Sequence, residues 1–317
     1  MKKIGILTRD CAGVNAAIRS VVRTATINNI EVVGFLKGYD GLIDEEFISL
    51  DHRSVSGIIN RGGTILKTAR SNRFYKEEYQ QQAVKNIHAN EIDGLIIIGG
   101  NGSLTGAHIL ATKYNIPIVG IPATIDNDIS EVEISLGADT AVNVALDALD
   151  KIRDTATSLE RIFIVEVMGR NCGYIALQLA LAGGCEEVLV PEKEIDIEFM
   201  CNEIKKGNEK GKISWIIIVA EGKAKASDIA NMITEKTGFE TRIAVLGHIQ
   251  RGGRPNAADR IMGARLGNFA VENLMRGETD ICVYHRDGKY YTVGLEAAIK
   301  TKQIDVDEYI RLIRILT

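Results

Sequence analysis

Short apolar runs rich in isoleucine and valine recur along the chain and constrain its fold more than any other feature. Near-continuous apolar runs of this length are typical of strands covered on both faces, as in parallel sheets. Longer stretches between them, such as 15–27 and 141–152, carry apolar residues at helical spacing. This alternation predicts an α/β architecture with right-handed crossovers. The expected strands are Ile4–Leu7, Val32–Phe35, Leu95–Ile98, Ile116–Ile121, Ile162–Val167, Trp215–Val219 and Ile243–Leu246.

Length and charge narrow the class of protein. A chain of 317 residues is long enough for one large or two medium domains with a sizeable core. Its formal net charge of −4 argues against a broad nucleic-acid-binding surface, so an anionic ligand would need local clusters of arginine and lysine. The five cysteines are scattered without CxxC spacing, which favours packed, reduced thiols over a disulfide framework or a zinc site. The apolar run at the N-terminus is too short for a signal peptide or a membrane span, and we expect a cytoplasmic protein that binds no membrane.

A glycine-rich turn follows the strand Leu95–Ile98, where the sequence reads GGNGS. In open parallel sheets, ligands gather at the carboxyl ends of the strands, and glycines there let backbone N–H groups approach phosphate oxygens. Many strand-to-helix turns also need glycine for geometry alone. By itself, this motif leaves both interpretations open.

The next expected strand ends in the polar sequence PATIDND, residues 122–128. One carboxylate at such a strand end is suited to accept a hydroxyl proton, and a second is suited to help hold Mg²⁺. An N-cap with Asx turns would explain one aspartate but not the whole set. This segment therefore predicts a catalytic site.

Basic and polar side chains follow three later strands. The sequences are MGR at 168–170, EG at 221–222 and GHIQRGG at 247–253. Arg170, Arg242 and Arg251, together with His248, have the charge that a sugar phosphate requires. A single arginine is more often a surface ion-pair partner, but several at successive strand ends favour a binding site.

Together these segments resemble the 6-phosphofructokinases. GGNGS, PATIDND, VEVMGR, the exit at Glu221 and GHIQRGG occur in the order and rough spacing of that family, as do NAAIR at 15–19 and RGGT at 61–64. The resemblance covers nearly the whole chain. It implies transfer of the ATP γ-phosphate to the 1-hydroxyl of fructose 6-phosphate, with Mg²⁺ as counter-ion, in glycolysis.

The resemblance also implies roles for individual residues on the sugar-phosphate side. Asp126 would be the general base, Thr124 would touch the transferring phosphate, and Arg170 would complete the catalytic set. Arg161 and Arg242 would reach the substrate of a neighbouring subunit, so that the active site is completed in an oligomer, usually a homotetramer. The implied substrate contacts are Thr124, Asp126, Arg161, Met168, Gly169, Arg170, Glu221, Arg242, His248 and Arg251.

On the nucleotide side, the implied metal ligands are Asp128 and Asn101. Pyrophosphate-dependent relatives resemble GGDDS and PKTIDND, where this chain has the small residues Gly102 and Ala123, which favours ATP on steric grounds. The implied nucleotide contacts are Arg9, Tyr39, Arg70, Ser71, Gly100, Asn101, Gly102 and Ser103.

A second ligand site is implied for an effector such as ADP or phosphoenolpyruvate. Arg19 and Arg23 fall one helical turn apart on one face, although a solvated basic face would look the same. The implied effector residues are Arg19, Arg23, Arg153, Glu186, Lys210 and Lys212.

Two departures from the family pattern fall on the nucleotide side. The loop after the first strand, TRDCAGVN, is two residues shorter than the family's TSGGDAPGMN, and Arg9 either contacts phosphate or blocks the site. Asn101 replaces an acidic residue and is a poorer ligand for Mg²⁺. These changes leave two alternatives open: a catalytically weakened paralogue that binds a sugar phosphate or effector as a regulatory protein, and a kinase for a different sugar phosphate.

The resemblance finally predicts two similar three-layer α/β domains with mostly parallel sheets and the active site in the cleft between them. The nucleotide domain would comprise residues 1–138 and about 251–303. The sugar-phosphate domain would comprise 139–250 and about 304–317.

Overall fold

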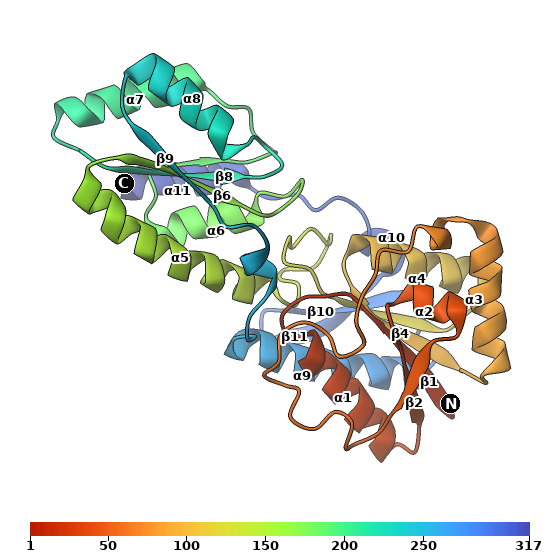
Figure 1. Ribbon diagram of the computed structural model, residues 1–317. Coiled ribbons are helices and arrows are strands. Elements are labelled where there is room, and N and C mark those ends of the chain that lie inside the picture. The colour runs from red at the N-terminus through yellow and green to blue at the C-terminus, as the bar shows by residue number, and fades with distance from the viewer. The chain divides into compact units, whose positions relative to one another are not determined.

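The computed structural model describes residues 1–317 and divides the chain into two compact units (Figure 1). Unit 1 comprises Met1–Thr140 and Arg251–Lys302, and unit 2 comprises Ala141–Gln250 and Gln303–Thr317. The chain therefore passes between the units after Thr140, after Gln250 and after Lys302.

Unit 1 is built on a seven-stranded sheet in the order β11-β10-β5-β4-β1-β2-β3. The five inner strands are parallel, and the edge strands β3 and β11 pair antiparallel with their neighbours. The strand bounds are β1 Lys3–Thr8, β2 Glu31–Phe35, β3 Phe47–Leu50, β4 Gly94–Gly99, β5 Ile118–Pro122, β10 Ile281–Arg286 and β11 Lys289–Gly294.

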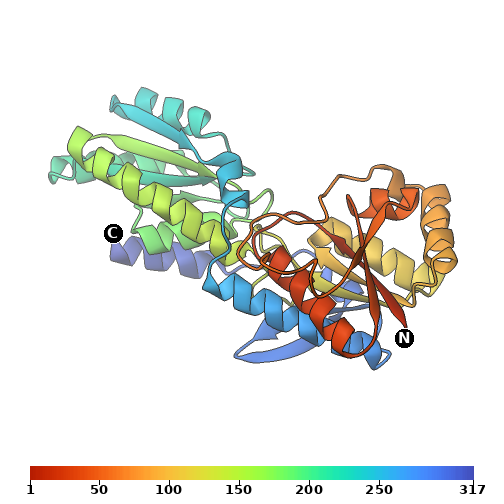
Figure 2. The ribbon, with the colours of Figure 1, turned by 60° about the horizontal axis from the view of Figure 1, so that its bottom comes forward.

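Helices cover both faces of this sheet, because alternate residues of its inner strands are buried on opposite sides. Ile96 and Ile98 of β4 pack with α1 and α9, whereas Leu95 and Ile97 pack with α3 and α4 (Figure 2). The helix bounds are α1 Val14–Ile27, α2 Tyr39–Asp44, η1 Arg73–Tyr75, α3 Glu77–Ala89, α4 Asn101–Tyr114, α9 Ala257–Met275 and α10 Leu295–Ala298.

Unit 2 has a four-stranded parallel sheet in the order β7-β8-β6-β9. Helices α7 and α8 lie on one face, and α5 and α6 lie on the other (Figure 1). The strand bounds are β6 Ile162–Val167, β7 Glu187–Leu189, β8 Trp215–Ala220 and β9 Thr241–Val245. The helix bounds are α5 Ala138–Leu159, α6 Tyr174–Gly183, α7 Ile197–Glu209, α8 Ala226–Thr237, η2 Gly247–Arg251 and α11 Val306–Leu316.

The predicted α/β class with mostly parallel sheets is confirmed, and all seven expected strands are present. Four strands were missed: β3, β7, β10 and β11. The expectation that every apolar run is covered on both faces is wrong for β9, an edge strand whose Val245 is 61% exposed. The two units differ in size, because their sheets have seven and four strands.

The structure also bears on the expectations about the cysteines and about membrane spans. All five cysteines are free and buried. No helix combines the length and the apolar sequence that crossing a membrane requires.

Candidate functional site

The carboxyl ends of β1, β4 and β5 meet at one edge of the unit 1 sheet, because these strands are parallel neighbours. Thr8 lies opposite Ile98, and Gly99 lies opposite Pro122. The residues that follow these strands, Arg9, the segment 100–103 and the segment 123–128, therefore start from adjacent positions. The sequence motifs of the expected nucleotide and catalytic sides are brought together at this edge.

Packing requires Gly99 of the GGNGS turn and leaves little room at Gly100. A Cβ on Gly99 would lie 2.6 Å from Oγ and 2.7 Å from Cβ of Ser103 and 3.0 Å from Cγ of Arg9, whereas one on Gly100 would lie 3.2 Å from Cβ of Thr124. A Cβ on Gly102, in contrast, would have no atom within 4 Å. Packing alone therefore explains Gly99, and it favours glycine at position 100 without requiring it. Open space lies beside Gly102 in the first turn of α4, where helix N–H groups favour an anion.

The loop between β5 and α5 is folded around two buried polar side chains, Asn127 and Ser135. The Asn127 amide donates to the Glu133 carbonyl at 3.1 Å and accepts from the Ser135 N–H at 2.9 Å. The Ser135 hydroxyl donates to the Thr124 carbonyl at 2.7 Å. Asn127 and Ser135 are fully buried, and Asn127 has a left-handed φ of 50°. These bonds fix the positions of the side chains on either side of Asn127.

Asp126 and Thr124 lie within this fixed loop. The Thr124 hydroxyl accepts from the Asp126 N–H at 3.2 Å, and Asp126 is only 6% exposed. A carboxylate held in a fixed, mostly dry position is suited to abstract a proton from an alcohol.

The far end of the loop is anchored by two other elements. The Cys11 thiol, in the turn after β1, donates to the Leu136 carbonyl at 2.8 Å. Asp259 of α9 accepts from the N–H of Gly137, just before α5, at 2.7 Å and from the N–H of Thr140, in the first turn of α5, at 2.9 Å. Asp259 thereby satisfies the first N–H groups of a helix from outside it. Burial raises the pKa of the Asp259 carboxyl and of the Cys11 thiol.

Asn101 and Asp128 form a pair with two unpartnered oxygens. The Asn101 amide nitrogen donates to the Asp128 carboxylate at 3.1 Å and to the Asp128 carbonyl at 3.2 Å. The Asn101 Oδ1 and the Asp128 Oδ1 are both buried without a hydrogen-bond partner. Buried polar atoms are rarely left unpaired, and carboxylate and amide oxygens are hard donors of the kind that Mg²⁺ takes. This pair therefore fits a magnesium ion that keeps most of its ligands from water and phosphate.

The nucleotide-side candidates lie around α2, the segment before η1 and α4. The Tyr39 hydroxyl donates to the Ser103 carbonyl at 2.6 Å, and its ring stacks on Phe74 at 4.1 Å. Burial raises the pKa of the Tyr39 hydroxyl. The Ser71 hydroxyl donates to Asp40 at 2.6 Å, and Arg70 beside it is exposed.

In unit 2, the carboxyl ends of β6, β8 and β9 bring together several sugar-phosphate candidates. The Arg170 N–H donates to the Glu221 carboxylate at 3.2 Å, which joins the ends of β6 and β8. The buried Gln250 accepts from the Met168 N–H at 3.4 Å and donates to the Gly247 carbonyl at 3.1 Å, which joins the end of β6 to η2. His248 lies in that turn and is exposed. Arg251 belongs to unit 1.

The turn that carries Arg170 has an uncommon backbone. Arg170 has a φ of 50° and Gly169 a φ of 149°, both in the region that favours glycine. A Cβ on Gly222 would lie 1.5 Å from the Arg170 carbonyl oxygen. Backbone strain of this kind persists only where the surroundings hold it, and it is common at ligand sites.

Arg161 and Arg242 lie at the opposite, amino-terminal ends of β6 and β9. Both pair with Glu240, Arg161 at 2.8 Å. A six-residue strand spans roughly 20 Å, so within unit 2 they do not join Met168 and Arg170.

The effector candidates fall into two groups. Arg19 and Arg23 lie on α1 in unit 1, where burial and the neighbouring charge lower the pKa of Arg19 and the Arg23 Nε is buried without a partner. In unit 2, Lys212 pairs with Glu186 at 3.0 Å and lies 4.7 Å from the Trp215 ring. Arg153 donates to the Gly184 carbonyl at 3.0 Å, and Lys210 is exposed.

A separate cavity of about 250 Å³ lies in unit 2 between β7, α7 and α11. Glu187, Phe199 and Arg314 are among its lining residues, and none of the predicted site residues lines it.

Sequence reasoning missed residues that position others. These side chains are buried or half-buried. They were overlooked because the sequence prediction considered only side chains that could contact a ligand or take part in the reaction. The motifs did contain a signal, since Asn127 lies inside PATIDND and Gln250 inside GHIQRGG. The residues are Asp40, Asn127, Ser135, Gln250 and Asp259.

Comparisons with known proteins identify the family to which this fold and these motifs belong. A family model described as Phosphofructokinase matches residues 3–274. The chain is 47% identical to the ATP-dependent 6-phosphofructokinase of Thermotoga neapolitana over 305 residues, which is 96% of each chain. It is 48% identical to the protein of that name from Aquifex aeolicus over 312 residues, which is 97% of each chain.

Solved structures show the same fold. Phosphofructokinase from Saccharomyces cerevisiae superposes with a TM-score of 0.88 at 32% identity, over 94% of this chain and 45% of the yeast chain. Pyrophosphate-dependent phosphofructokinase from Marinobacter aquaeolei superposes with a TM-score of 0.84 at 23% identity, over 99% of this chain and 91% of that chain, a likeness of fold alone.

Proposed function

Because the chain belongs to the phosphofructokinase family, we propose that it transfers the γ-phosphate of ATP to the 1-hydroxyl of fructose 6-phosphate, a step of glycolysis. The observation that carries this proposal is the loop between β5 and α5, which holds Thr124, Asp126 and Asp128 around the buried Asn127. This arrangement suits phosphoryl transfer, which depends mainly on positioning and on neutralising charge.

In this proposal, Asp126 accepts the proton of the sugar 1-hydroxyl, and Thr124 contacts the transferring phosphate. Asp128 and Asn101 hold Mg²⁺ through their unpartnered oxygens. When bound, Mg²⁺ supplies counter-charge to the nucleotide phosphates.

Residues at the carboxyl ends of the unit 2 strands bind the sugar phosphate, and Arg170 completes the catalytic set. The fixed backbone of the Arg170 turn supports this role, because it sets where the guanidinium starts. The residues proposed to bind fructose 6-phosphate are Met168, Gly169, Arg170, Glu221, His248 and Arg251.

The proposed phosphoryl donor is ATP. The open space beside Gly102 and the small side chain of Ala123 leave room for a nucleotide α-phosphate. The relatives that match over nearly the full length are named as ATP-dependent enzymes. The residues proposed to line the nucleotide site are Arg9, Tyr39, Arg70, Ser71, Gly100, Asn101, Gly102 and Ser103.

Two further parts of the proposal concern assembly and regulation. Arg161 and Arg242 would serve the active site of a neighbouring subunit in a cytoplasmic homotetramer, which fits their distance from the carboxyl ends of their own strands. Arg19, Arg23, Arg153, Glu186, Lys210 and Lys212 would bind ADP or phosphoenolpyruvate. Trp215, the sole tryptophan, lies beside Lys212, so its fluorescence should change when such an effector is added.

The test is a coupled assay of the purified chain with Mg²⁺, fructose 6-phosphate and either ATP or pyrophosphate. We expect fructose 1,6-bisphosphate to form with ATP and not with pyrophosphate. Binding of fructose 6-phosphate without turnover at high protein concentration would favour the regulatory alternative. Turnover with another hexose phosphate only would revise the substrate.

A further inference from the structure

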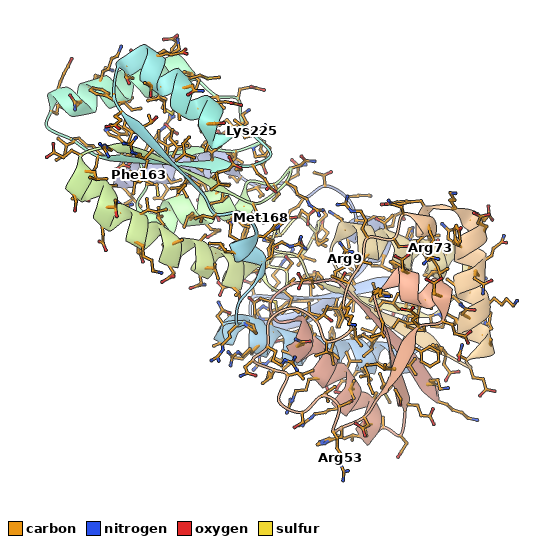
Figure 3. All side chains as sticks on the ribbon, viewed as in Figure 1. Arg9, Arg53, Arg73, Phe163, Met168 and Lys225 are labelled. Atoms are coloured by element: carbon orange, nitrogen blue, oxygen red, sulfur yellow. The ribbon has the colours of Figure 1, made fainter.

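Arg9 stands at the end of β1 with both its backbone and its side chain fixed. Its N–H donates to the Ile98 carbonyl at 2.9 Å, which extends the pairing of β1 with β4 by one residue. Its side chain then passes over Gly99, where a Cβ would lie 3.0 Å from its Cγ. Its guanidinium Nη1 donates to the Ala69 carbonyl at 2.5 Å (Figure 3, where Arg9 is labelled).

The segment that receives this bond contains no strand or helix between β3 and η1, so side chains of other elements hold it. In its middle, the Asn15 amide donates to the Arg61 carbonyl at 3.1 Å and accepts from the Ile65 N–H at 2.9 Å. The hydroxyls of Thr8 and Thr64 lie 2.7 Å apart. Residues 61–65 are thus fixed to β1 and α1.

The end of the same segment is fixed from another side. Ser71 donates to Asp40 of α2, and Arg73 pairs with both Asp40 and Asp44. Ala69 and Ser71 are therefore held by different elements, Ala69 by Arg9 and Ser71 by Asp40. Arg70, between them, is exposed.

We propose that Arg9 is a positioning residue that holds Ala69 so that the neighbouring Arg70 presents its guanidinium to the phosphates of the nucleotide. This inference rests on the proposed function. A long cation on an unfixed loop loses more conformational freedom on binding than one on a fixed backbone, which weakens its affinity. The Arg9 bond removes part of that loss before the nucleotide arrives.

Arg9 is suited to this task by its chemistry. Its planar guanidinium has several donors, so one can hold a carbonyl while the charge stays at the site. Arg9 directly follows the last residue of β1, and the missing side chain of Gly99 leaves room for the stem of Arg9. On this view, Arg9 supports nucleotide binding and does not block it.

The first test is a double-mutant cycle with Arg9→Ala, Arg70→Ala and the double variant, in the assay with ATP. We expect Arg9→Ala to raise the KM for ATP roughly tenfold, the loss expected for a hydrogen bond to a charged group, while kcat changes little. In the Arg70→Ala background, the same change should add almost nothing, because Arg9 acts through Arg70. Arg9→Lys, which keeps one donor and the charge, should restore part of the affinity. Arg276→Ala, on the exposed end of α9, is the matched control.

Two outcomes of the cycle would overturn the inference. If the effects of the two substitutions multiply in full, Arg9 contacts the phosphates independently. If Arg9→Ala lowers the KM for ATP, Arg9 obstructs the site.

A second measurement is independent of turnover. Amide hydrogen exchange of residues 64–74 in the ligand-free protein should become faster in Arg9→Ala and stay unchanged in Arg276→Ala, because the segment loses one of its anchors. Unchanged exchange in Arg9→Ala would refute the anchoring role. A wild-type chain with no turnover on ATP would contradict the proposed function alone, and the exchange result would still decide whether Arg9 holds the segment.

Discussion

The loop between β5 and α5 in unit 1 and the strand ends of unit 2 position their side chains by different means. In the loop, Asn127 and Ser135 are buried and bonded to each other, and Asp126 is almost inaccessible. At the strand ends of unit 2, Arg170 and Glu221 are exposed, and their backbone is held by a close glycine contact.

The difference follows from what each region must do. A group that abstracts a proton has to lie within hydrogen-bond reach of one hydroxyl, so a rigid buried network suits it. A group that binds a phosphate through a long cation tolerates movement of its tip if its backbone is fixed. We therefore expect substitutions in the loop to act mainly on kcat and substitutions at the unit 2 strand ends to act mainly on KM.

The largest effect is expected for Asp126→Asn. The amide cannot accept the hydroxyl proton, and general-base catalysis contributes on the order of a hundredfold to ten-thousandfold, so kcat should fall by about a thousandfold. Binding of fructose 6-phosphate, measured by calorimetry, should be nearly unchanged. Glu133→Gln, an exposed carboxylate of the same loop, should stay close to wild type. A kcat for Asp126→Asn within tenfold of wild type would remove Asp126 as the base.

The next effect is expected for Asn127→Ala, which leaves the Ser135 N–H buried without a partner. We expect a loss of about 3 kcal/mol in the free energy of unfolding and a fall of kcat by roughly tenfold to a hundredfold, because the loop loses its internal bonds. Urea unfolding and steady-state kinetics measure the two effects.

Asn29→Ala is the matched control for this substitution. Asn29 also has a left-handed φ, 57°, but it is exposed. Both variants place alanine in the same strained region, at a cost of roughly 1–2 kcal/mol, so the difference between them reports the buried bonds. Equal stability losses would show that the network around Asn127 adds little.

How regular the apolar pattern is explains how much of the fold could be predicted from the sequence. The inner strands carry apolar side chains on both faces, and this pattern identified six of them, together with the edge strand β9. β3, β10 and β11 escaped because polar or aromatic residues interrupt the pattern, and β7 because it has only three residues. The predicted bounds of β9 nearly match those observed, but nothing in its apolar sequence indicates that β9 lies at the edge of its sheet.

For the site, the sequence predicted groups whose chemistry is visible in one residue, such as Asp126 and Arg170. It could not predict which groups hold them. Asp259 lies 133 positions beyond Asp126, and only the fold places its carboxylate against the start of α5. Arg9 was recognised as unusual, but its bond to Ala69 depends on where the segment 61–72 runs.

Gly222→Ala tests the unit 2 side of the comparison. The added Cβ would lie 1.5 Å from the Arg170 carbonyl oxygen, so the turn that carries Arg170 must move. Displacement by about 1 Å can cost up to about a hundredfold, and we expect the KM for fructose 6-phosphate to rise at least tenfold, with the KM for ATP unchanged.

Gly294→Ala is the control, because a Cβ there has no atom within 4 Å. A lower kcat at an unchanged KM for fructose 6-phosphate would contradict the division of roles drawn above, since it would place the Arg170 turn with the proton-transfer machinery.

The smallest effect is expected at Glu187, a half-buried carboxylate that is poorly satisfied, in contrast to the fully buried Asn127. Its carboxylate lies 3.5 Å from Arg314 and accepts a long bond of 3.4 Å from the Val188 N–H. Burial raises the pKa of Glu187 above its ordinary value of 4.5, despite the opposing charges of Arg314 and Lys193. The folded state therefore holds this proton more tightly than the unfolded state does. As the pH rises from about 4.5 through the raised pKa, the ionised form increasingly opposes folding.

Glu187→Gln removes that opposition and keeps an acceptor for Arg314. We expect the variant to be slightly more stable than wild type at pH 8, with the gain disappearing as the pH falls toward 4.5, measured by urea unfolding across this range. Glu194→Gln, fully exposed in the same unit, should show no such trend. A gain that persists unchanged at low pH would mean that packing, and not the buried charge, limits stability at this position, and Glu187 would then resemble the satisfied groups of unit 1.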